Sequence, residues 1–329
     1  MANVKFAGGF AMLKSTLVAA LLFSFAATPG LAAAWSYTDG TVQTVTLDHV
    51  PNRIVMHANT AAGLIPLGIR PIAIYVDSPV AEDKSLQGLD LSGIEIVGEA
   101  WGQIDIEKVA ALQPDLFLAE WWPLDKAFSG LESGAGSTNQ QILKLAPITG
   151  PTQGDSIVKL IGDYETLARS LGANLDDPQI VADKAAFETA LGKFKAAVAR
   201  KPNLTALPVW AGTDALYVAA TQGSSELMDF AGWGLKLITP ELADDRGYWE
   251  TLSWEQADKY QPDLLLVDNR SDTTMQTAAA QPMWTSIKAA AAGQVTGWPA
   301  FWLRNYKAYA QALDKLSAAI DGADENLTN

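Results

Sequence analysis

Aromatic side chains are the residues of this chain best suited to recognise another molecule. The 329 residues include eleven tryptophans, two histidines and no cysteine. Eleven indole rings exceed the needs of a core of this size, and rings with a polar edge are typical of ligand-binding surfaces. The lack of cysteine argues against disulfides, thiolate metal sites, a cysteine nucleophile and a lipid-modified cysteine. The composition therefore indicates noncovalent binding through aromatic faces.

The two histidines, His49 and His57, are too few for a site that holds zinc or free iron directly. His57 could act as a single haem ligand, or it could be a polar residue packed at a strand end. No nucleophile elbow, phosphate-binding loop or dinucleotide-binding glycine pattern is present. The sequence does not exclude a hydrolase that uses paired carboxylates, because any two of the 37 acidic residues could meet in the fold. A binding protein is favoured, and a secreted α/β hydrolase is the alternative.

The first 34 residues have the pattern of a secretory signal peptide. They contain Lys5 and Lys14, no acidic residue, and an apolar stretch over 17–27. Small residues at 32–34 favour cleavage before Trp35. The apolar stretch is shorter than the roughly 20 residues that cross a bilayer. We therefore expect export to a periplasm.

The chain is acidic, with 23 basic and 37 acidic residues and a net charge of −14 at pH 7. Nucleic acids and anionic membrane surfaces select positive patches, so neither is an expected partner. The length that remains after signal removal suits two hydrophobic cores better than one. We expect a soluble periplasmic monomer without a lipid anchor, whose synthesis begins at Met1 or Met12.

An internal repeat divides the chain. The segment IEKVAALQPDLFL at 106–118 resembles WEQADKYQPDLLL at 254–266. In each copy an N-cap candidate, Asp105 or Ser253, begins a short helix that a proline ends, and the following apolar run predicts a buried strand. Ser253 and Gln256 also fit a capping box. The repeat predicts two similar α/β lobes.

The surrounding patterns predict β-α-β alternation and therefore largely parallel sheets. Strands are expected at 53–57, 72–76 and 94–98, on either side of a turn at 212–214, and at 295–298, with long helices at 156–171 and 178–200. The predicted fold is α/β, with two similar lobes of mostly parallel sheet joined by one long inter-lobe helix. Its predicted parts are a signal peptide (1–34), an N-terminal lobe (35–153), a connecting helix (154–173) and a C-terminal lobe (174–329).

The order and spacing of several short motifs resemble those of a known family. The motifs are PNRIV at 51–55, LGIRP at 67–71, IVG at 96–98, the two QPDL units, LAP at 145–147 and PMW at 282–284. The chain is similar to the ferric-siderophore and cobalamin group of periplasmic ABC-transporter substrate-binding proteins, and most similar to hydroxamate-siderophore binders. The resemblance implies a shallow inter-lobe cleft, limited closure, and delivery to an inner-membrane permease. Iron would arrive within the siderophore, so no cofactor, resident metal or catalytic residue is expected.

The resemblance assigns ligand contacts first to the C-terminal lobe. The segment 298–304 is similar to one that places two side chains in the cleft of hydroxamate binders, so Trp302 and Arg304 are the first choices. Trp249 matches a second cleft aromatic, and Tyr248 precedes it. Arg304 stands where those binders have a tyrosine, and its guanidinium suggests a carboxylate-bearing siderophore that contains citrate.

Further candidates lie beside the two Gln-Pro-Asp units. Trp121 and Trp122 follow the first predicted strand, Trp101 precedes the first helix, and Arg270 follows the second strand, where cleft residues lie in such folds. Trp101 stands near the place of a basic cleft residue in the family. The ligand stays open between a ferric siderophore and another chelate such as cobalamin or haem.

The resemblance also implies one acidic residue on each lobe that docks on permease arginines. Glu226 matches the position in the second lobe. The position in the first lobe falls near Gln140, and Glu132 is a neighbouring substitute. Four other tryptophans are assigned to the hydrophobic core: Trp210, Trp233, Trp254 and Trp284.

Overall fold

The computed structural model describes residues 34–131, 137–240, 242, 248–271 and 273–328. Residues 1–33 of the predicted signal peptide lie outside this part of the chain, and so does Glu132. Within it, no helix is both long enough and apolar enough to cross a membrane.

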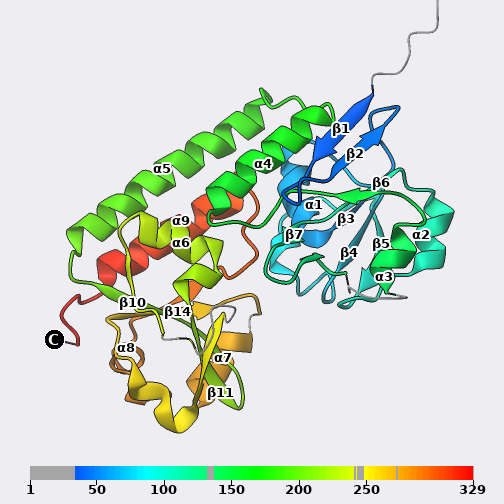
Figure 1. Cartoon of the computed structure of the whole chain (residues 1–329). Helices are drawn as coiled ribbons and strands as arrows, with labels where there is room; N and C mark the ends of the chain where they lie inside the picture. Colours follow the sequence, from blue (N-terminus) through cyan, green and yellow to red (C-terminus); the bar gives the residue numbers. More distant parts are fainter. Residues whose placement is uncertain (1–33, 132–136, 241, 243–247, 272, 329) are drawn as a thin grey trace, which may run out of the picture. The chain divides into compact units, whose positions relative to one another are not determined.

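The first lobe is built on a parallel sheet with strand order β5-β4-β3-β6-β9 (Figure 1). Its strands are β3 (Ile54–His57), β4 (Ala73–Val76), β5 (Glu95–Glu99), β6 (Leu116–Leu118) and β9 (Ile148–Thr149). Its helices are α1 (Ala58–Leu64), the 3-10 turns η1 (Ile65–Leu67) and η2 (Lys84–Leu86), α2 (Ile106–Leu112) and α3 (Thr138–Ile142). Two antiparallel hairpins pair β1 (Trp35–Thr38) with β2 (Thr44–Leu47) and β7 (Trp121–Trp122) with β8 (Ala127–Phe128).

The second lobe carries a mixed sheet with strand order β13-β11-β10-β14-β15, and β12 also pairs with β10. Its strands are β10 (Thr205–Ala211), β11 (Ala215–Ala219), β12 (Lys236–Leu237), β13 (Trp249–Ser253), β14 (Leu264–Asp268) and β15 (Val295–Trp298). Strand β11 runs antiparallel to its two neighbours, so this sheet is less uniformly parallel than the first. Its helices are η3 (Thr221–Gly223), α6 (Ser225–Gly232), η4 (Trp254–Lys259), α7 (Thr273–Ala280), η5 (Trp284–Ser286), α8 (Lys288–Ala291) and α9 (Tyr306–Gly322).

The chain passes from the first sheet to the second through two helices, α4 (Ile157–Ser170) and α5 (Pro178–Arg200), drawn in green in Figure 1. Both predicted helices are confirmed within two residues at each end. Ser156 and Asp177 accept hydrogen bonds from backbone N–H groups at the helix starts, as N-caps do. Asp229 of α6 accepts a further hydrogen bond of 2.9 Å from the N–H of Ile157, so the second lobe also fixes the start of α4.

Hydrophobic layers cover both faces of each sheet because side chains alternate along a strand. In β3, Ile54 and Met56 join the largest buried cluster, whereas Val55 joins a cluster on the other face of the first sheet. The largest cluster includes Leu118 of the first sheet and Leu266 of the second, together with residues of α4, α5 and α9. The two lobes therefore share a continuous apolar core.

The two repeat copies are confirmed as helix-to-strand units. Asp115 and Asp263 perform the same role: each side chain accepts a hydrogen bond from the N–H of the residue at the start of a neighbouring strand, Arg53 at 3.0 Å and Thr205 at 2.9 Å. Asp105 caps α2 as predicted. The predicted capping box at Ser253 is wrong, because η4 is a 3-10 helix whose N-cap side chain makes no capping hydrogen bond.

Candidate functional site

A cavity of about 440 Å³ lies where strands of both sheets end. In parallel α/β sheets, loops after the carboxyl ends of strands form the usual ligand crevice. The first lobe contributes residues after β3, β4, β5 and β6, and the second contributes residues after β14 and β15 and at the start of β13. The lining comprises His57, Asn59, Asp77, Ser78, Glu82, Asp83, Lys84, Trp101, Trp122, Asp125, Ala127, Phe128, Ser129, Tyr248, Trp249, Arg270, Phe301 and Trp302.

Aromatic rings from the second lobe form one wall of the cavity. The indole N–H of Trp302 donates a 2.9 Å hydrogen bond to Asn269 Oδ1, which fixes the ring. Trp249 packs against the buried Trp298, with ring centroids 5.9 Å apart. Gly223 lets Tyr248 approach, because a Cβ at this position would lie 2.7 Å from the tyrosine ring. Trp249 and Trp302 therefore line one groove, as the sequence interpretation requires.

The Phe301 ring lies beside three other cavity residues, from both lobes. Its ring lies 6.1 Å from Trp122 of the first lobe and 6.1 Å from Tyr248, and the guanidinium of Arg270 lies 5.1 Å above it. Its backbone has φ of 63°, a left-handed conformation that costs a bulky residue about 1–3 kcal/mol. Such strain persists only where the surroundings impose it, and it is concentrated at functional sites.

Glu226 imposes part of that conformation. Its carboxylate accepts a hydrogen bond from the N–H of Phe301 and a second, of 2.7 Å, from Ser224 Oγ. Burial raises the pKa of Glu226, and the nearby Arg304 offsets this rise only in part. The residue is 1% exposed. The sequence interpretation placed Glu226 on a docking surface, but here its carboxylate is enclosed and faces inward.

The first-lobe wall is formed by Trp101, 56% exposed, and by Trp122, whose indole N–H donates a 2.7 Å hydrogen bond to Ser129 Oγ. The adjacent Trp121 points elsewhere, because successive side chains of a strand alternate in direction. Its ring packs edge-on against Phe128, with centroids 5.0 Å apart, and it is not among the lining residues. Of the two predicted tryptophans, only Trp122 lies at the cavity.

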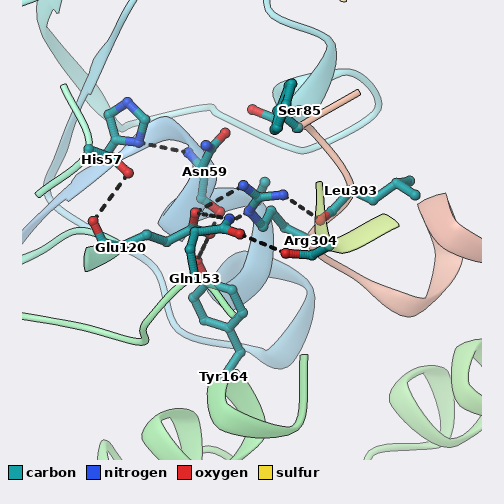
Figure 2. Close-up of polar contacts among 12 residues, drawn as sticks. His57, Asn59, Ser85, Glu120, Gln153, Tyr164, Leu303 and Arg304 are labelled. Atoms are coloured by element: carbon teal, nitrogen blue, oxygen red, sulfur yellow. Dashed lines mark hydrogen bonds and ion pairs between the residues drawn. The ribbon is translucent and has the colours of Figure 1, made fainter. Parts of the chain in front are cut away.

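His57 lies in the cavity wall, almost fully buried. Its Nδ1 accepts a 3.3 Å hydrogen bond from the N–H of Asn59, and its Nε2 lies 3.1 Å from Asp77 Oδ2 (Figure 2 labels His57 and Asn59). An accepting Nδ1 means that Nε2 carries the proton and donates to Asp77. Neither ring nitrogen offers a free lone pair, so His57 as placed here is an N-cap of α1 and not a metal ligand.

Arg304 does not reach the cavity in this structure. Its guanidinium forms a bidentate ion pair with Glu120 of the first lobe, and both side chains are 0% exposed. Tyr164 and Gln153 also donate hydrogen bonds to this carboxylate (Figure 2). Burial alone would raise the pKa of Glu120, but Arg304 and these donors hold it below its ordinary value. Arg304, which was predicted to contact the ligand, instead joins the two lobes through this ion pair.

Arg270 supplies a guanidinium at the cavity. It pairs with Asp268 through Nε at 2.9 Å and through a second nitrogen at 2.7 Å, while its own side chain is 44% exposed. Burial raises the pKa of Asp268, and Arg270 partly offsets that effect. The predicted position of Arg270 at the mouth of the strand is therefore confirmed, although its role toward a ligand stays a prediction.

Six of the eight predicted contact residues meet at the cavity: Trp101, Trp122, Tyr248, Trp249, Arg270 and Trp302. Phe301, which stands in the segment 298–304 but was not one of these eight, also lines the cavity. Trp254 and Trp284 are buried as predicted, but Trp210 is 36% exposed and stacks on Tyr217. Among the described residues, no group of three His, Cys, Asp or Glu side chains could hold a metal ion.

A family model described as periplasmic binding protein matches residues 73–300. The chain therefore belongs to this family, whose members bind substrates and are not enzymes. A search of the curated proteins found no match.

Among solved structures, the chain is similar to DesE, a ferric-siderophore receptor protein from Streptomyces coelicolor. The two share 28% identity with a TM-score of 0.80, over 88% of this chain and 99% of that one. A siderophore periplasmic binding protein of Thermobifida fusca shares 22% identity and a TM-score of 0.58, over 83% and 97%. The petrobactin-binding protein YclQ of Bacillus subtilis shares 16% identity and a TM-score of 0.63, over 88% and 99%. The fold is thus that of siderophore-binding periplasmic proteins of ABC iron transporters.

Proposed function

We propose that this chain captures a ferric siderophore in the aromatic cavity and delivers it to an inner-membrane ABC permease. The observation that carries the proposal is the cavity itself, in which rings from both lobes face one space. A siderophore fills the coordination shell of iron with its own oxygens, so the protein needs apolar faces and a few donors rather than metal ligands. Export to the periplasm as a soluble monomer without a lipid anchor is part of the same proposal.

The charges around the cavity favour a hydroxamate ligand over a citrate-containing one. The expectation of a carboxylate-bearing siderophore rested on Arg304, which is neutralised by Glu120. In the cavity lining, the four carboxylates Asp77, Glu82, Asp83 and Asp125 outnumber the two cationic side chains, Lys84 and Arg270. Three hydroxamates balance the charge of a ferric ion, whereas a carboxylate-rich chelate is anionic and would be repelled by such a lining. We therefore infer a neutral or cationic ferric hydroxamate.

Tryptophan fluorescence tests the proposal directly. Titration with a ferric trihydroxamate should quench the emission, whereas the metal-free chelator and a free ferric salt should have little effect. Ferric citrate and a ferric catecholate serve as anionic comparisons and should bind at least tenfold more weakly. Failure of every ferric siderophore to quench would refute the proposed function.

The neighbouring pair of tryptophans provides a matched control. Trp122→Phe should reduce the quenching amplitude and the affinity, because this ring lines the cavity. Trp121→Phe should leave both unchanged, because that ring packs on the first-lobe core. Cobalamin and haem, the alternative chelates, have visible chromophores. The absorption spectrum of the protein purified from its own host would reveal either one.

A further inference from the structure

We propose that Phe301 is the central contact for the ligand and that Glu226 is a positioning residue that holds the Phe301 backbone in place. The inference rests on the proposed function, since it assigns roles within the same cavity. It also replaces the expected docking role of Glu226 with a role in ligand recognition.

Phe301 lies between side chains of the two lobes. Its ring contacts Trp122 of the first lobe and lies under Arg270 of the second. Trp122 and Arg270 occupy equivalent positions, each four residues beyond the last leucine of its repeat copy. One ring thus meets the matching ends of both repeat units. Phe301 is also one of the residues that line the cavity, so its ring is available to a chelate that binds there.

The backbone of Phe301 adopts a left-handed conformation. Its φ of 63° is unfavourable for an aromatic residue, so the chain must be held there by other contacts. The N–H of Phe301 donates to the carboxylate of Glu226, a group 1% exposed. A hydrogen bond to a buried carboxylate is stronger than one between neutral groups. It therefore favours the one conformation that directs this N–H toward α6.

The surroundings of Glu226 explain why a carboxylate can stay there. The residue lies in the first turn of α6, where the helix dipole favours negative charge. Ser224 Oγ donates a hydrogen bond to its second oxygen. The positive charge of Arg304 attracts it, and Arg304 follows Phe301 by three residues in the same loop. Since these interactions satisfy the carboxylate within the protein, it has no oxygen turned outward to an external arginine.

Double-mutant analysis of ligand affinity tests the proposal. Glu226→Leu should weaken binding of a ferric trihydroxamate at least tenfold, and Glu226→Gln about threefold, because the amide oxygen is a weaker acceptor. Phe301→Ala should weaken binding at least tenfold. In the Phe301→Ala background neither change at Glu226 should weaken binding further, because Glu226 acts through Phe301. A general loss of stability would instead lower affinity equally in both backgrounds.

Hydrogen exchange of the ligand-free protein gives a second readout. The Phe301 amide should be protected in the wild type, and its exchange should accelerate at least tenfold in Glu226→Leu and less in Glu226→Gln. Unchanged affinity and unchanged protection in the Gln variant, or losses that persist undiminished without the Phe301 ring, would overturn the proposal. If the wild type binds no ferric siderophore, the proposed function fails, while the exchange experiment still tests whether Glu226 holds Phe301.

Discussion

Each repeat copy is followed by a buried carboxylate that pairs with an arginine, but the two ion pairs have different roles. Glu120 and Asp268 are equivalent positions, two residues beyond the last leucine of each copy, and each buried carboxylate binds an arginine. The partner of Glu120 in the first lobe is Arg304, which is distant in sequence and fully buried. The partner of Asp268 in the second lobe is Arg270, which is two residues away and 44% exposed at the cavity.

This difference shows that the position of the paired carboxylate decides whether an arginine is available to a ligand. The Glu120–Arg304 pair joins the two lobes, so neither charge is available to a ligand. Asp268 instead anchors one edge of Arg270 and leaves the planar face over Phe301. The first pair is a structural connection, and the second provides a polar contact within an aromatic cavity.

The largest expected difference between the pairs is in stability. Arg304→Met leaves the buried carboxylate of Glu120 without its counter-charge, and we expect it to lower the free energy of unfolding by about 3–5 kcal/mol. Arg270→Met should cost about 1 kcal/mol, because removal of the half-exposed guanidinium would open the buried Asp268 carboxylate to water from the cavity. Urea denaturation followed by circular dichroism measures both. Equal costs would contradict the assignment of the two pairs.

The exposed arginine, Arg270, should contribute to ligand affinity. Arg270→Met removes the guanidinium above the Phe301 ring, and we expect binding of a ferric trihydroxamate to weaken roughly tenfold, or about 1.4 kcal/mol. Arg200→Met is a matched control, since this residue pairs with Asp321 and lies outside the cavity lining. Fluorescence titration gives both affinities. An Arg270 variant that binds like the control would argue against a ligand role.

The two carboxylates should also respond to pH with opposite sign. The pKa of Glu120 is lowered, so its contribution to stability is present above the ordinary glutamate pKa and is lost as pH falls through the folded value. The pKa of Asp268 is raised by burial, so the cost of its charge is relieved as pH falls. Relative to the wild type, Glu120→Gln should therefore gain stability on acidification and Asp268→Asn should lose it. Denaturation midpoints at several pH values measure both slopes. Slopes of the same sign, or two slopes each opposite to the one expected, would contradict the assigned directions.

The smallest expected difference lies at the starts of the repeat helices. Asp105→Ala removes the side chain that accepts from the Lys108 N–H, and we expect a loss of about 1 kcal/mol in stability. Ser253→Ala, at the equivalent position, should change stability by less than about 0.5 kcal/mol, because Ser253 makes no capping hydrogen bond. Thermal unfolding of the two variants provides the comparison, and a larger effect at Ser253 would contradict it.

Sequence alone predicted the repeat, the long helices α4 and α5, and most strands of the two sheets, because a buried face of a helix or strand requires a periodic pattern of apolar side chains. It did not predict the long helix α9 or the hairpins β1–β2 and β7–β8. The roles of Asp115 and Asp263 follow from the same repeat, since equal local sequences make equal local hydrogen bonds. The candidate contacts at Trp122, Trp249 and Trp302 lie next to strand ends, where fold class alone favours a site.

Only the tertiary structure decided which charged and strained groups serve the cavity. Sequence could not show that Arg304 is neutralised, because its partner Glu120 lies 184 residues away. It could not show the burial of Glu226 or the left-handed backbone of Phe301, which depend on each other across 75 residues. Apolar patterning is a local property of the chain, whereas the availability of a charge depends on which distant groups the packed core brings beside it.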